Sequence, residues 1–470
     1  MNALWTSAEA AAATSGRNSR DWSAQGVSID SRSLARGDLF VAIKGIKSDG
    51  HDFVADALGK GAAAAAVSRA LKRIPADAPL LLVADTQKAL EDLGRAARAR
   101  SQATVIGVTG SVGKTGTKEA LRHALERQGP TVASLGSLNN HWGVPLSLAR
   151  MPRDAKYGVF EMGMNHAGEI DALTRLVRPD VALITTVEPA HLGFFPSVEA
   201  IADAKAEIFN GMGGRGAAVL NRDNPYYDRL AARAAAAGIA RIVSFGAHEE
   251  SSVRLVDCEL HGCASSVTVS ALGEVFDYSV ALPGRHWVMN SLAVLAAVQA
   301  AGGDVVAAAA AMATLEPMAG RGRRFKIQVP GGEAVLIDES YNASPASMRA
   351  AIAVLAAMKP QNGGRRIAVL GDMLELGADA ARLHAELAQA LDAAGIDLIF
   401  ASGPEMRALY DALPARRRGG HAENAAETAA MTAARLKPGD VVMVKGSHGS
   451  RMHEVAARLA AAKPAVAAKE

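Results

Sequence analysis

Cysteine is scarce in this sequence: the 470 residues contain only Cys258 and Cys263. One pair cannot supply a disulfide framework in a protein of this size, which favours a reducing compartment. His261 lies between the two thiols, but no second ligand pair follows at the spacing of a zinc site. We therefore interpret both cysteines as thiols at strand edges.

Long apolar runs and an excess of one charge are also missing. No uninterrupted apolar stretch reaches the roughly 18 residues that a membrane span needs. The first residues have no basic segment followed by an apolar one, so we expect no secretory signal and a cytoplasmic protein, which we take to be a monomer. The formal charge is +3, and the basic clusters at 321–324 and 416–418 are too small for a nucleic-acid-binding stripe.

The composition that remains is that of an ordinary globular protein, with 49% hydrophobic and 21% charged residues. At roughly 150 residues per domain, the length predicts about three domains. We place them at residues 1–100, 101–317 and 318–470. In the first, short apolar runs at 38–43 and 80–83 and a helical segment after Val54 indicate a small α/β unit.

The middle block alternates apolar runs with helical stretches. The runs are continuous rather than alternating, which is typical of parallel strands covered by helices on both faces. The sequence therefore predicts a central doubly wound sheet. Alternation over 253–282 predicts an antiparallel ribbon, followed by a helix over 287–301. The apolar runs lie at 104–108, 158–160, 181–184 and 217–220.

The last block repeats the strand and helix alternation, with strands expected at 334–337, 366–370, 398–400 and 441–444. This pattern predicts a second, Rossmann-like α/β sheet. A break at 318–320 would act as a hinge that lets two domains close on a ligand. The predicted fold class is therefore α/β, with three domains.

A glycine-rich turn at 109–115 reads Thr-Gly-Ser-Val-Gly-Lys-Thr and lies between a predicted strand and a predicted helix. In such a loop the lysine reaches the terminal phosphates and the last hydroxyl binds Mg²⁺, here Lys114 and Thr115. Val108 stands where the usual motif has its first glycine, so an incidental glycine turn is the alternative. We expect a Mg²⁺-dependent enzyme that binds ATP through the backbone of Gly110, Ser111, Val112 and Gly113.

This variant loop, followed by Lys118 and Glu119, resembles the ATP loop of the Mur ligase superfamily, whose members form amide bonds in peptidoglycan and folate metabolism. Further segments match in the family's order and cover almost the whole chain. In the first block they are 30–32, 37–42 and 49–51; in the middle block 137–145, 161–164, 189–192 and 204–207; in the last block 338–345, 370–377 and 444–447.

The resemblance implies a catalytic and metal-binding set. Glu161 ends an apolar strand on the side where doubly wound folds bind ligands, and in this family it holds Mg²⁺. His191 would help bind a second Mg²⁺. Lys205 would be carbamylated, which turns a repelling ammonium into an anionic ligand. The alternatives are an exposed strand-end glutamate, a structural histidine and a solvated helix lysine. Lys114, Lys205 and His191 are the expected catalytic residues, and Thr115, Glu161, His191 and Lys205 the expected metal ligands.

The same resemblance assigns nucleotide and substrate contacts. Asn290 would bind adenine, unless it is only a polar residue at a helix N-terminus. Arg321 and Asp338 would reach the phosphates or ribose, with an interdomain salt bridge as the alternative. The expected substrate contacts are Ser31 and Arg32 for the uridine nucleotide, Asn139 and Asn140 in the central block, and Tyr341, Asn342 and Lys445 for a dipeptide, where loop packing is the alternative. Glu339 and His448 depart from the family's pattern, and His448 stays unassigned.

The C-terminal segments most resemble the family member that adds a dipeptide. The resemblance therefore implies an ATP-dependent ligase that joins UDP-N-acetylmuramoyl-tripeptide to D-alanyl-D-alanine through an acyl phosphate. Its partners would be these small molecules, with no nucleic acid and no membrane. The alternatives are a family member that adds one amino acid to the muramyl chain or glutamate to folate and, from another class, a P-loop nucleotide switch.

Overall fold

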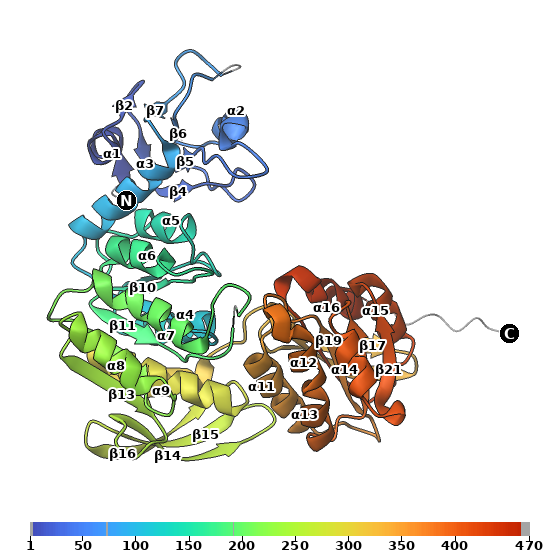
Figure 1. The fold of residues 1–470 in the computed structure, drawn as a ribbon. Coiled ribbons are helices and arrows are strands. Elements are labelled where there is room, and N and C mark those ends of the chain that lie inside the picture. Colours follow the sequence, from blue (N-terminus) through green and yellow to red (C-terminus); the bar gives the residue numbers. More distant parts are fainter. Residues whose placement is uncertain (1–2, 72–73, 191, 462–470) are drawn as a thin grey trace.

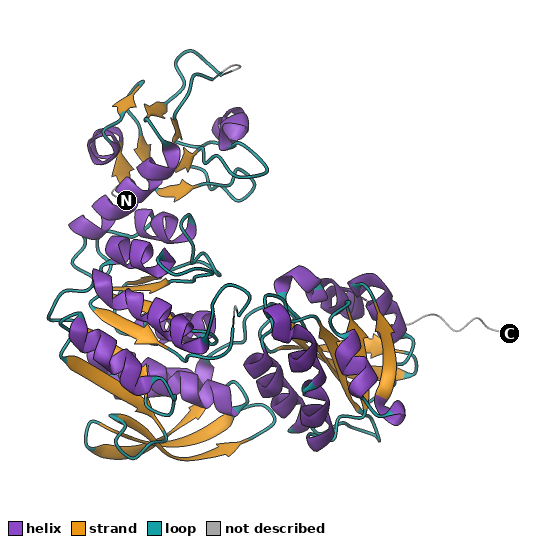
Figure 2. Ribbon diagram, viewed as in Figure 1, coloured by secondary structure: helices purple, strands orange, loops and turns teal. Residues whose placement is uncertain are grey.

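The computed structural model describes residues 3–71, 74–190 and 192–461. Three α/β bodies follow one another along the chain, with the N-terminal and C-terminal bodies contacting the central one from different sides (Figure 1). Helices cover the sheets, as Figure 2 shows, so the predicted α/β class is confirmed. None of the helices in the described ranges combines the length and apolar character needed to cross a membrane.

The N-terminal body contains a five-stranded sheet in the order β2-β7-β6-β5-β4. Trp5 ties it to the central body, because its Nε1 donates to the Ala149 carbonyl at 2.9 Å. The strands are β1 (Trp5–Thr6), β2 (Arg17–Asn18), β3 (Ser23–Ala24), β4 (Gly26–Ser28), β5 (Asp38–Val41), β6 (Ala64–Val67) and β7 (Leu80–Leu82), and the helices are α1 (Ser7–Thr14), α2 (Val54–Gly59) and α3 (Thr86–Arg100).

The central sheet has nine strands in the order β16-β15-β14-β13-β12-β11-β8-β10-β9. The pairs from β9 to β14 are parallel, and β14 to β16 form the predicted antiparallel ribbon, which continues the same sheet. The strands are β8 (Thr104–Thr109), β9 (Thr131–Ala133), β10 (Tyr157–Glu161), β11 (Val181–Ile184), β12 (Ala217–Asn221), β13 (Arg241–Gly246), β14 (Val253–Leu260), β15 (Ser265–Ala271) and β16 (Glu274–Val280).

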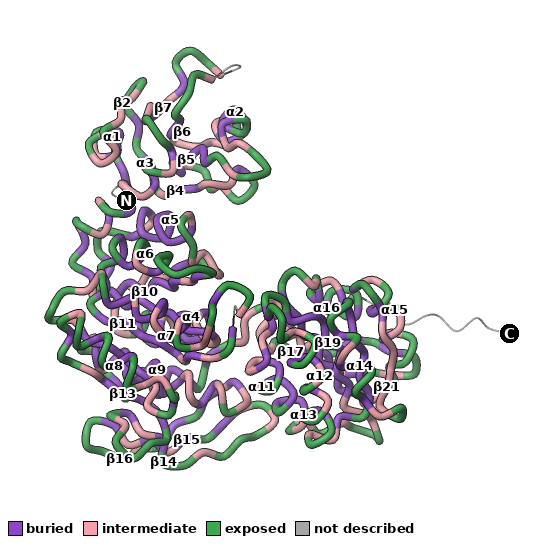
Figure 3. Tube along the Cα trace, in the orientation of Figure 1, coloured by how far each residue is buried: buried purple, intermediate pink, exposed green. Residues whose placement is uncertain are grey.

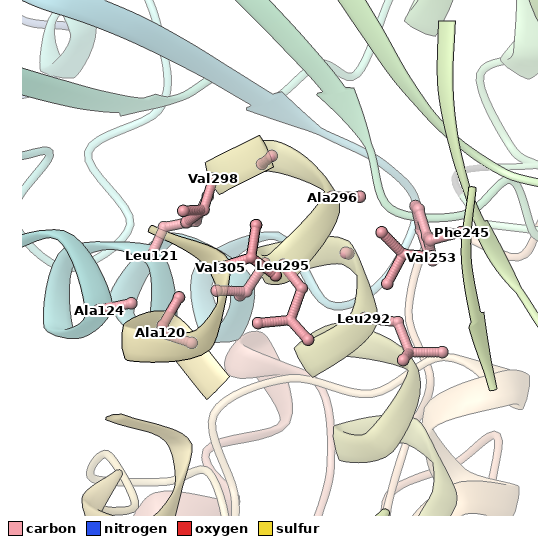
Figure 4. Close-up of a cluster of buried hydrophobic side chains, with 14 of the residues drawn as sticks. Ala120, Leu121, Ala124, Phe245, Val253, Leu292, Leu295, Ala296, Val298 and Val305 are labelled. Carbon is pink, nitrogen blue, oxygen red and sulfur yellow. The ribbon is translucent and has the colours of Figure 1, made fainter. Parts of the chain in front are cut away.

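Helices lie on both faces of this sheet, and each face has its own buried apolar cluster. In Figure 3 the buried segments follow the strands through the middle of the body. One cluster packs α4, α9 and α10 against β13 and β14 (Figure 4). The helices are α4 (Lys114–Leu125), α5 (Gly143–Ala149), α6 (Glu169–Val177), α7 (Val198–Ala206), α8 (Tyr227–Ala236), α9 (Arg285–Ala300) and α10 (Val305–Ala311).

Replacing Leu292 with alanine tests this cluster, because Leu292 is fully buried on α9 (Figure 4). We expect the free energy of unfolding to fall by about 2–5 kcal/mol, since the methylenes lost leave a cavity. The matched control is Leu135→Ala, whose side chain is 60% exposed. Denaturant unfolding of both variants measures the difference, and an equal loss in both would contradict the packing described here.

The C-terminal body has six strands in the order β17-β18-β22-β19-β20-β21, all parallel except the hairpin of β17 and β18. The four predicted strands are confirmed within β18, β19, β20 and β22. The strands are β17 (Arg323–Val329), β18 (Gly332–Glu339), β19 (Arg366–Gly371), β20 (Leu398–Ser402), β21 (Arg418–Ala422) and β22 (Val441–Lys445), and the helices are α11 (Pro345–Ala356), α12 (Ala380–Ala385), α13 (Leu387–Ala393), α14 (Arg407–Ala412), α15 (Ala425–Ala433) and α16 (Met452–Ala461).

The turn between β14 and β15 contacts the C-terminal body. Arg324 of β17 donates through Nη2 to the Gly262 carbonyl at 2.6 Å and through Nη1 to Cys263 Sγ at 3.2 Å. Cys258 lies in β14, as expected, and Arg285 approaches its Sγ at 3.6 Å. The prediction of a strand-edge thiol is wrong for Cys263, because the chain reverses there. Both thiols face arginines, so nothing here resembles a zinc site.

Candidate active site

A cavity of about 850 Å³ lies between the central and C-terminal bodies. Its central wall is the carboxyl edge of the parallel strands and the start of α4, the edge where doubly wound folds bind ligands. Beyond the β14–β15 turn, the two bodies also meet where the Gly193 N–H donates to the Glu375 carbonyl at 3.0 Å. The predicted site residues that line the cavity are Ser111, Val112, Gly113, Lys114, Thr115, Asn139, Glu161, Asn290, Arg321, Tyr341, Asn342 and Lys445.

The loop before α4 needs its glycines. Gly110 has φ +147°, and a Cβ there would lie 1.9 Å from Thr185 Oγ1. That hydroxyl also fixes the loop, because it donates to the Val112 carbonyl at 2.6 Å. Gly113 has φ +87° and immediately precedes α4. The N-terminal N–H groups of α4 therefore face the cavity, which is the geometry that binds phosphate.

Gly110→Ala is expected to weaken ATP binding by about 5- to 140-fold, because the added methyl must displace Thr185 at a strain cost of about 1–3 kcal/mol. Nucleotide titration by calorimetry measures the loss. Gly59→Ala is the control, since no atom lies within 4 Å of the Cβ it would add. Unchanged affinity in Gly110→Ala would rule out a fixed loop.

Lys114 and Arg321 bring two cations to this loop. Lys114 Nζ donates to the Gly110 carbonyl at 2.8 Å, and burial lowers the pKa of Lys114 while Glu161 opposes the shift. Arg321 Nη2 donates to Thr115 Oγ1 at 3.1 Å, and its guanidinium lies 4.0 Å from the centre of the Tyr341 ring. Arg321 thus touches the loop through a hydroxyl, not through an interdomain salt bridge.

Glu161 is fully buried at the end of β10, so it is not an exposed strand-end residue. Its backbone pairs with Val108 of β8, which places it beside the loop. One carboxylate oxygen accepts from Asn139 Nδ2 at 2.7 Å. The other, Oε2, has no hydrogen-bond partner among the described residues. A buried carboxylate oxygen without a partner suits a hard cation.

Lys205 lies near the end of α7 and is only 2% exposed, so it is not a solvated helix lysine. Burial, reinforced by the charge of Lys114, holds the pKa of Lys205 well below its usual range. The neutral amine is therefore easier to reach than in a solvated lysine. The prediction for His191 falls on a residue outside the described ranges.

Asn290 lies in the second turn of α9, so it is not a helix N-terminal residue. Its Oδ1 is 2.8 Å from the position that a Cβ on Gly113 would take. The Trp287 ring packs equally closely on Gly116 of α4, at 2.9 Å from its Cβ position. Helix α9 thus brings an amide and an indole to the start of α4, where the phosphate loop ends.

The C-terminal wall is built around Lys445, at the end of β22. Its Nζ donates to the Asn342 carbonyl at 2.9 Å and lies 3.6 Å from Glu339 Oε2. Burial lowers the pKa of Lys445 and raises that of Glu339, while their mutual attraction opposes both shifts. His448, left unassigned above, also lines the cavity, and its ring contacts those of Tyr341 and His453.

Three family models cover most of the chain. They are described as the Mur ligase family catalytic domain, the Mur ligase middle domain and the Mur ligase glutamate ligase domain, and they match residues 23–104, 108–298 and 323–448. An Escherichia coli protein named UDP-N-acetylmuramoyl-tripeptide--D-alanyl-D-alanine ligase is 36% identical over 91% of this chain and 92% of its own. The chain belongs to the Mur ligase family.

Solved structures agree with this result. A crystal structure of MurF from Acinetobacter baumannii matches this Mur ligase with a TM-score of 0.82 and 31% identity, over 97% of this chain and 98% of that one. MurF from Thermotoga maritima, solved in complex with ADP, matches with a TM-score of 0.74 and 27% identity, over 92% and 96% of the two chains. The predicted family and fold class are thereby confirmed.

Several predicted residues of this Mur ligase lie away from the cavity lining. Asn140 Oδ1 accepts from the Gly143 N–H at 2.9 Å and so holds the start of α5. The Asp338 carboxylate accepts from the Gly320 N–H at 3.1 Å and shapes the hinge turn. Ser31 and Arg32 belong to the N-terminal body, where Arg32 lowers the pKa of Asp30 to about 2. Their predicted contacts with nucleotide and substrate stay predictions.

The sequence reasoning missed other residues in the lining. Thr185 and Thr186 follow β11, where polar residues directly after an apolar run were the available signal. His286 precedes Trp287 on α9, and burial, with a smaller effect of Lys445, lowers the pKa of His286 to about 4. Ser137 and Glu188 also line the cavity.

Proposed function

We propose that this Mur ligase joins the tripeptide carboxylate of UDP-N-acetylmuramoyl-tripeptide to the amine of D-alanyl-D-alanine, with ATP becoming ADP and phosphate. The full-length similarity to the Escherichia coli ligase and to MurF structures supports this specificity. The observation that carries the chemistry is one cavity that unites the phosphate loop, the unpartnered Glu161 oxygen and the C-terminal wall.

The reaction needs ATP because a carboxylate is a poor electrophile. Transfer of the terminal phosphoryl group to the tripeptide carboxylate yields an acyl phosphate, which the dipeptide amine attacks with loss of phosphate. Lys114 neutralises the charge that develops during transfer, and the loop N–H groups position the nucleotide. Arg321 lies close enough to Thr115 to contribute a second positive charge from the C-terminal body.

The residues present fit a magnesium site. Glu161 Oε2, Thr115 Oγ1 and a carbamylated Lys205 would hold Mg²⁺, together with His191 for a second ion. When bound, Mg²⁺ supplies charge neutralisation at the phosphates. Among the described residues no cluster of three His, Cys, Asp or Glu side chains forms a metal site. Phosphate oxygens, water and the carbamate would complete the coordination.

The burial of Lys205 supports its carbamylation. Only a neutral amine adds to CO₂: the nitrogen lone pair forms the N–C bond, the nitrogen loses a proton, and an anionic carbamate results. The lowered pKa of Lys205 supplies that neutral amine, and the charge of Lys114 stabilises the anion formed.

The remaining assignments follow the family. Ser31 and Arg32 would bind the uridine nucleotide in the domain formed by residues 1–100. Residues 101–317 would bind ATP, with Asn290 at the adenine and with Asn139 and Asn140 at the substrate. Arg321 and Asp338 of the C-terminal domain would reach the phosphates or ribose. Tyr341, Asn342 and Lys445 of residues 318–470 would hold the dipeptide. We further propose a monomeric cytoplasmic enzyme, consistent with two unpaired cysteines.

The test supplies ATP, Mg²⁺ and UDP-muramyl-tripeptide with D-alanyl-D-alanine or with single amino acids, and follows phosphate release and product mass. We expect amide product with the dipeptide, and transfer of a heavy oxygen isotope from the tripeptide carboxylate to phosphate. Product with one amino acid only would indicate another member of the family. Absence of amide with every amine would leave the nucleotide switch.

A further inference from the structure

The glutamates that line the cavity differ in their hydrogen-bond and ion-pair partners. Glu161 faces the phosphate loop and gives one oxygen to Asn139, and Glu339 is paired with Lys445. Glu375 lies on the C-terminal side, where its backbone bonds to Gly193. Glu188 lines the same cavity from the central body. It has no part in the mechanism above.

The phosphate loop itself fixes the backbone of Glu188. Ser111 Oγ donates to the Glu188 carbonyl at 3.0 Å, and the Glu188 N–H donates to Ser111 Oγ at 3.0 Å. A third hydrogen bond joins the phosphate loop to the same segment, because the Ser111 N–H donates to the Thr186 carbonyl at 2.8 Å. Glu188 therefore keeps a set position relative to the site of phosphoryl transfer.

The carboxylate of Glu188 has few polar partners. Among the described residues it receives one hydrogen bond, from Thr186 Oγ1 at 3.3 Å. Burial raises the pKa of Glu188, and Arg349 on α11 opposes that shift. The first residues of α11 also line the cavity, so the carboxylate faces the body that would deliver the dipeptide. A half-buried carboxylate with one weak partner can still accept a proton.

We propose that the Glu188 carboxylate binds the ammonium of the incoming dipeptide and accepts the proton that its nitrogen must lose during amide formation. This inference rests on the proposed function, since it concerns the second half of that reaction. An α-ammonium with a pKa of about 8 is mostly protonated at neutral pH and carries no free lone pair. A carboxylate beside the acyl phosphate both attracts this cation and removes its proton.

The step balances without a further reactant. One ammonium proton is lost to solvent first, so the Glu188 carboxylate is still ionised when the amine attacks. The nitrogen lone pair then forms the C–N bond, and the nitrogen that results is positively charged and acidic. Its remaining extra proton moves to a Glu188 oxygen, the C–O bonding pair leaves with phosphate, and Glu188 releases the proton to the departing phosphate or to water. Glu188 is therefore ionised again at the end of the reaction.

The test separates the two halves of the reaction with a different nucleophile. Hydroxylamine is mostly uncharged at neutral pH, so it attacks an acyl phosphate without prior loss of an ammonium proton, and the proton released as the hydroxamate forms can pass to water. In E188Q we expect kcat/KM for D-alanyl-D-alanine to fall by about 10²–10³, the usual contribution of a positioned general base. Hydroxamate formation from ATP and UDP-muramyl-tripeptide should stay at the wild-type level. Because it needs an ordered phosphate loop, it also shows that the variant is folded.

Three further variants complete the experiment. E188D keeps a carboxylate and should recover part of the dipeptide rate. E375Q removes the neighbouring carboxylate and should leave the ratio of amide to hydroxamate unchanged, and E199Q, on the exposed face of α7, should match the wild type. The acidic limb of the kcat/KM profile for the dipeptide should vanish in E188Q. The groups that face Glu188 and influence this limb are Arg349 and Tyr226.

The outcomes are distinct. Loss of hydroxamate together with amide in E188Q would place Glu188 in the ATP half and overturn the proposal. An unchanged dipeptide rate in E188Q, or a selective amide loss in E375Q instead, would overturn it as well. Wild-type protein that forms no hydroxamate would count against the acyl phosphate, and hence against the proposed function rather than against Glu188.

Discussion

Replacing Lys114 with alanine is expected to lower kcat for ligation by roughly 10³ or more. Lys114 is a cation of the phosphate loop, and a positioned charge that meets developing phosphoryl charge contributes about 10²–10³ or more in rate. The side chain also bonds to the Gly110 carbonyl, so some loss of ATP affinity should accompany the loss in kcat. Phosphate release at saturating substrates, with calorimetric titration of ATP, measures both.

Lys156→Ala is the matched control for this variant. Its Nζ also donates to a backbone carbonyl, that of Gln128 at 3.0 Å, but at the far end of the strands from the cavity. We expect wild-type kcat and wild-type ATP affinity for it. A Lys114→Ala enzyme that kept its rate would show that the loop binds nucleotide without taking part in phosphoryl transfer.

Replacing Lys205 with alanine should lower kcat by about 10²–10³, because the anionic ligand that the carbamate would supply to Mg²⁺ disappears. The truncated side chain leaves a buried space beside Lys114. A short-chain carboxylic acid fits this space and presents the same pair of anionic oxygens, so added acid should restore part of the activity in a saturable manner. Initial rates against acid concentration measure the rescue.

The control here is Lys205→Met, which keeps the aliphatic volume and leaves no room for the acid. It should be as inactive as Lys205→Ala and should not respond to added acid. Full activity of the alanine variant without acid would end the carbamate proposal. Equal rescue of both variants would mean that the acid acts elsewhere.

Most of the fold could be predicted because its strands are buried on both faces. The runs that became β8, β10, β11 and β12 are continuous apolar stretches, which are typical of a parallel sheet under two helical layers. Two of the strands that were missed have a different composition. β21 (Arg418–Ala422) begins with arginine and two glycines, and β17 (Arg323–Val329) carries arginines and lysine on an edge of its sheet, so neither resembles a buried strand.

The candidate site likewise has a part that could be predicted from the sequence and a part that could not. Residues within one local motif, such as Lys114 and Thr115, carry their own signal, since loop and helix are fixed by neighbours in the sequence. Contacts that join distant segments carry none. Nothing near Glu188 in the sequence indicates that Ser111 holds it, and nothing near Asp338 indicates that its carboxylate is turned toward the Gly320 N–H. Such pairings arise only when the chain has folded.

The C-terminal body meets the central one through peptide groups at two separate places, the Gly262 carbonyl bound by Arg324 and the Gly193 N–H bound to the Glu375 carbonyl. The first contact lies close in the sequence to Gly322, near which the chain enters the C-terminal body. A rotation of the C-terminal body about this point can therefore leave the Arg324 hydrogen bond intact. The second contact joins segments that are distant in the sequence from Gly322, and it must break whenever the bodies separate. Release of ADP and of the finished muramyl peptide through such a separation would include the breaking of this bond. We therefore expect turnover under saturating conditions to be limited by product departure rather than by bond making.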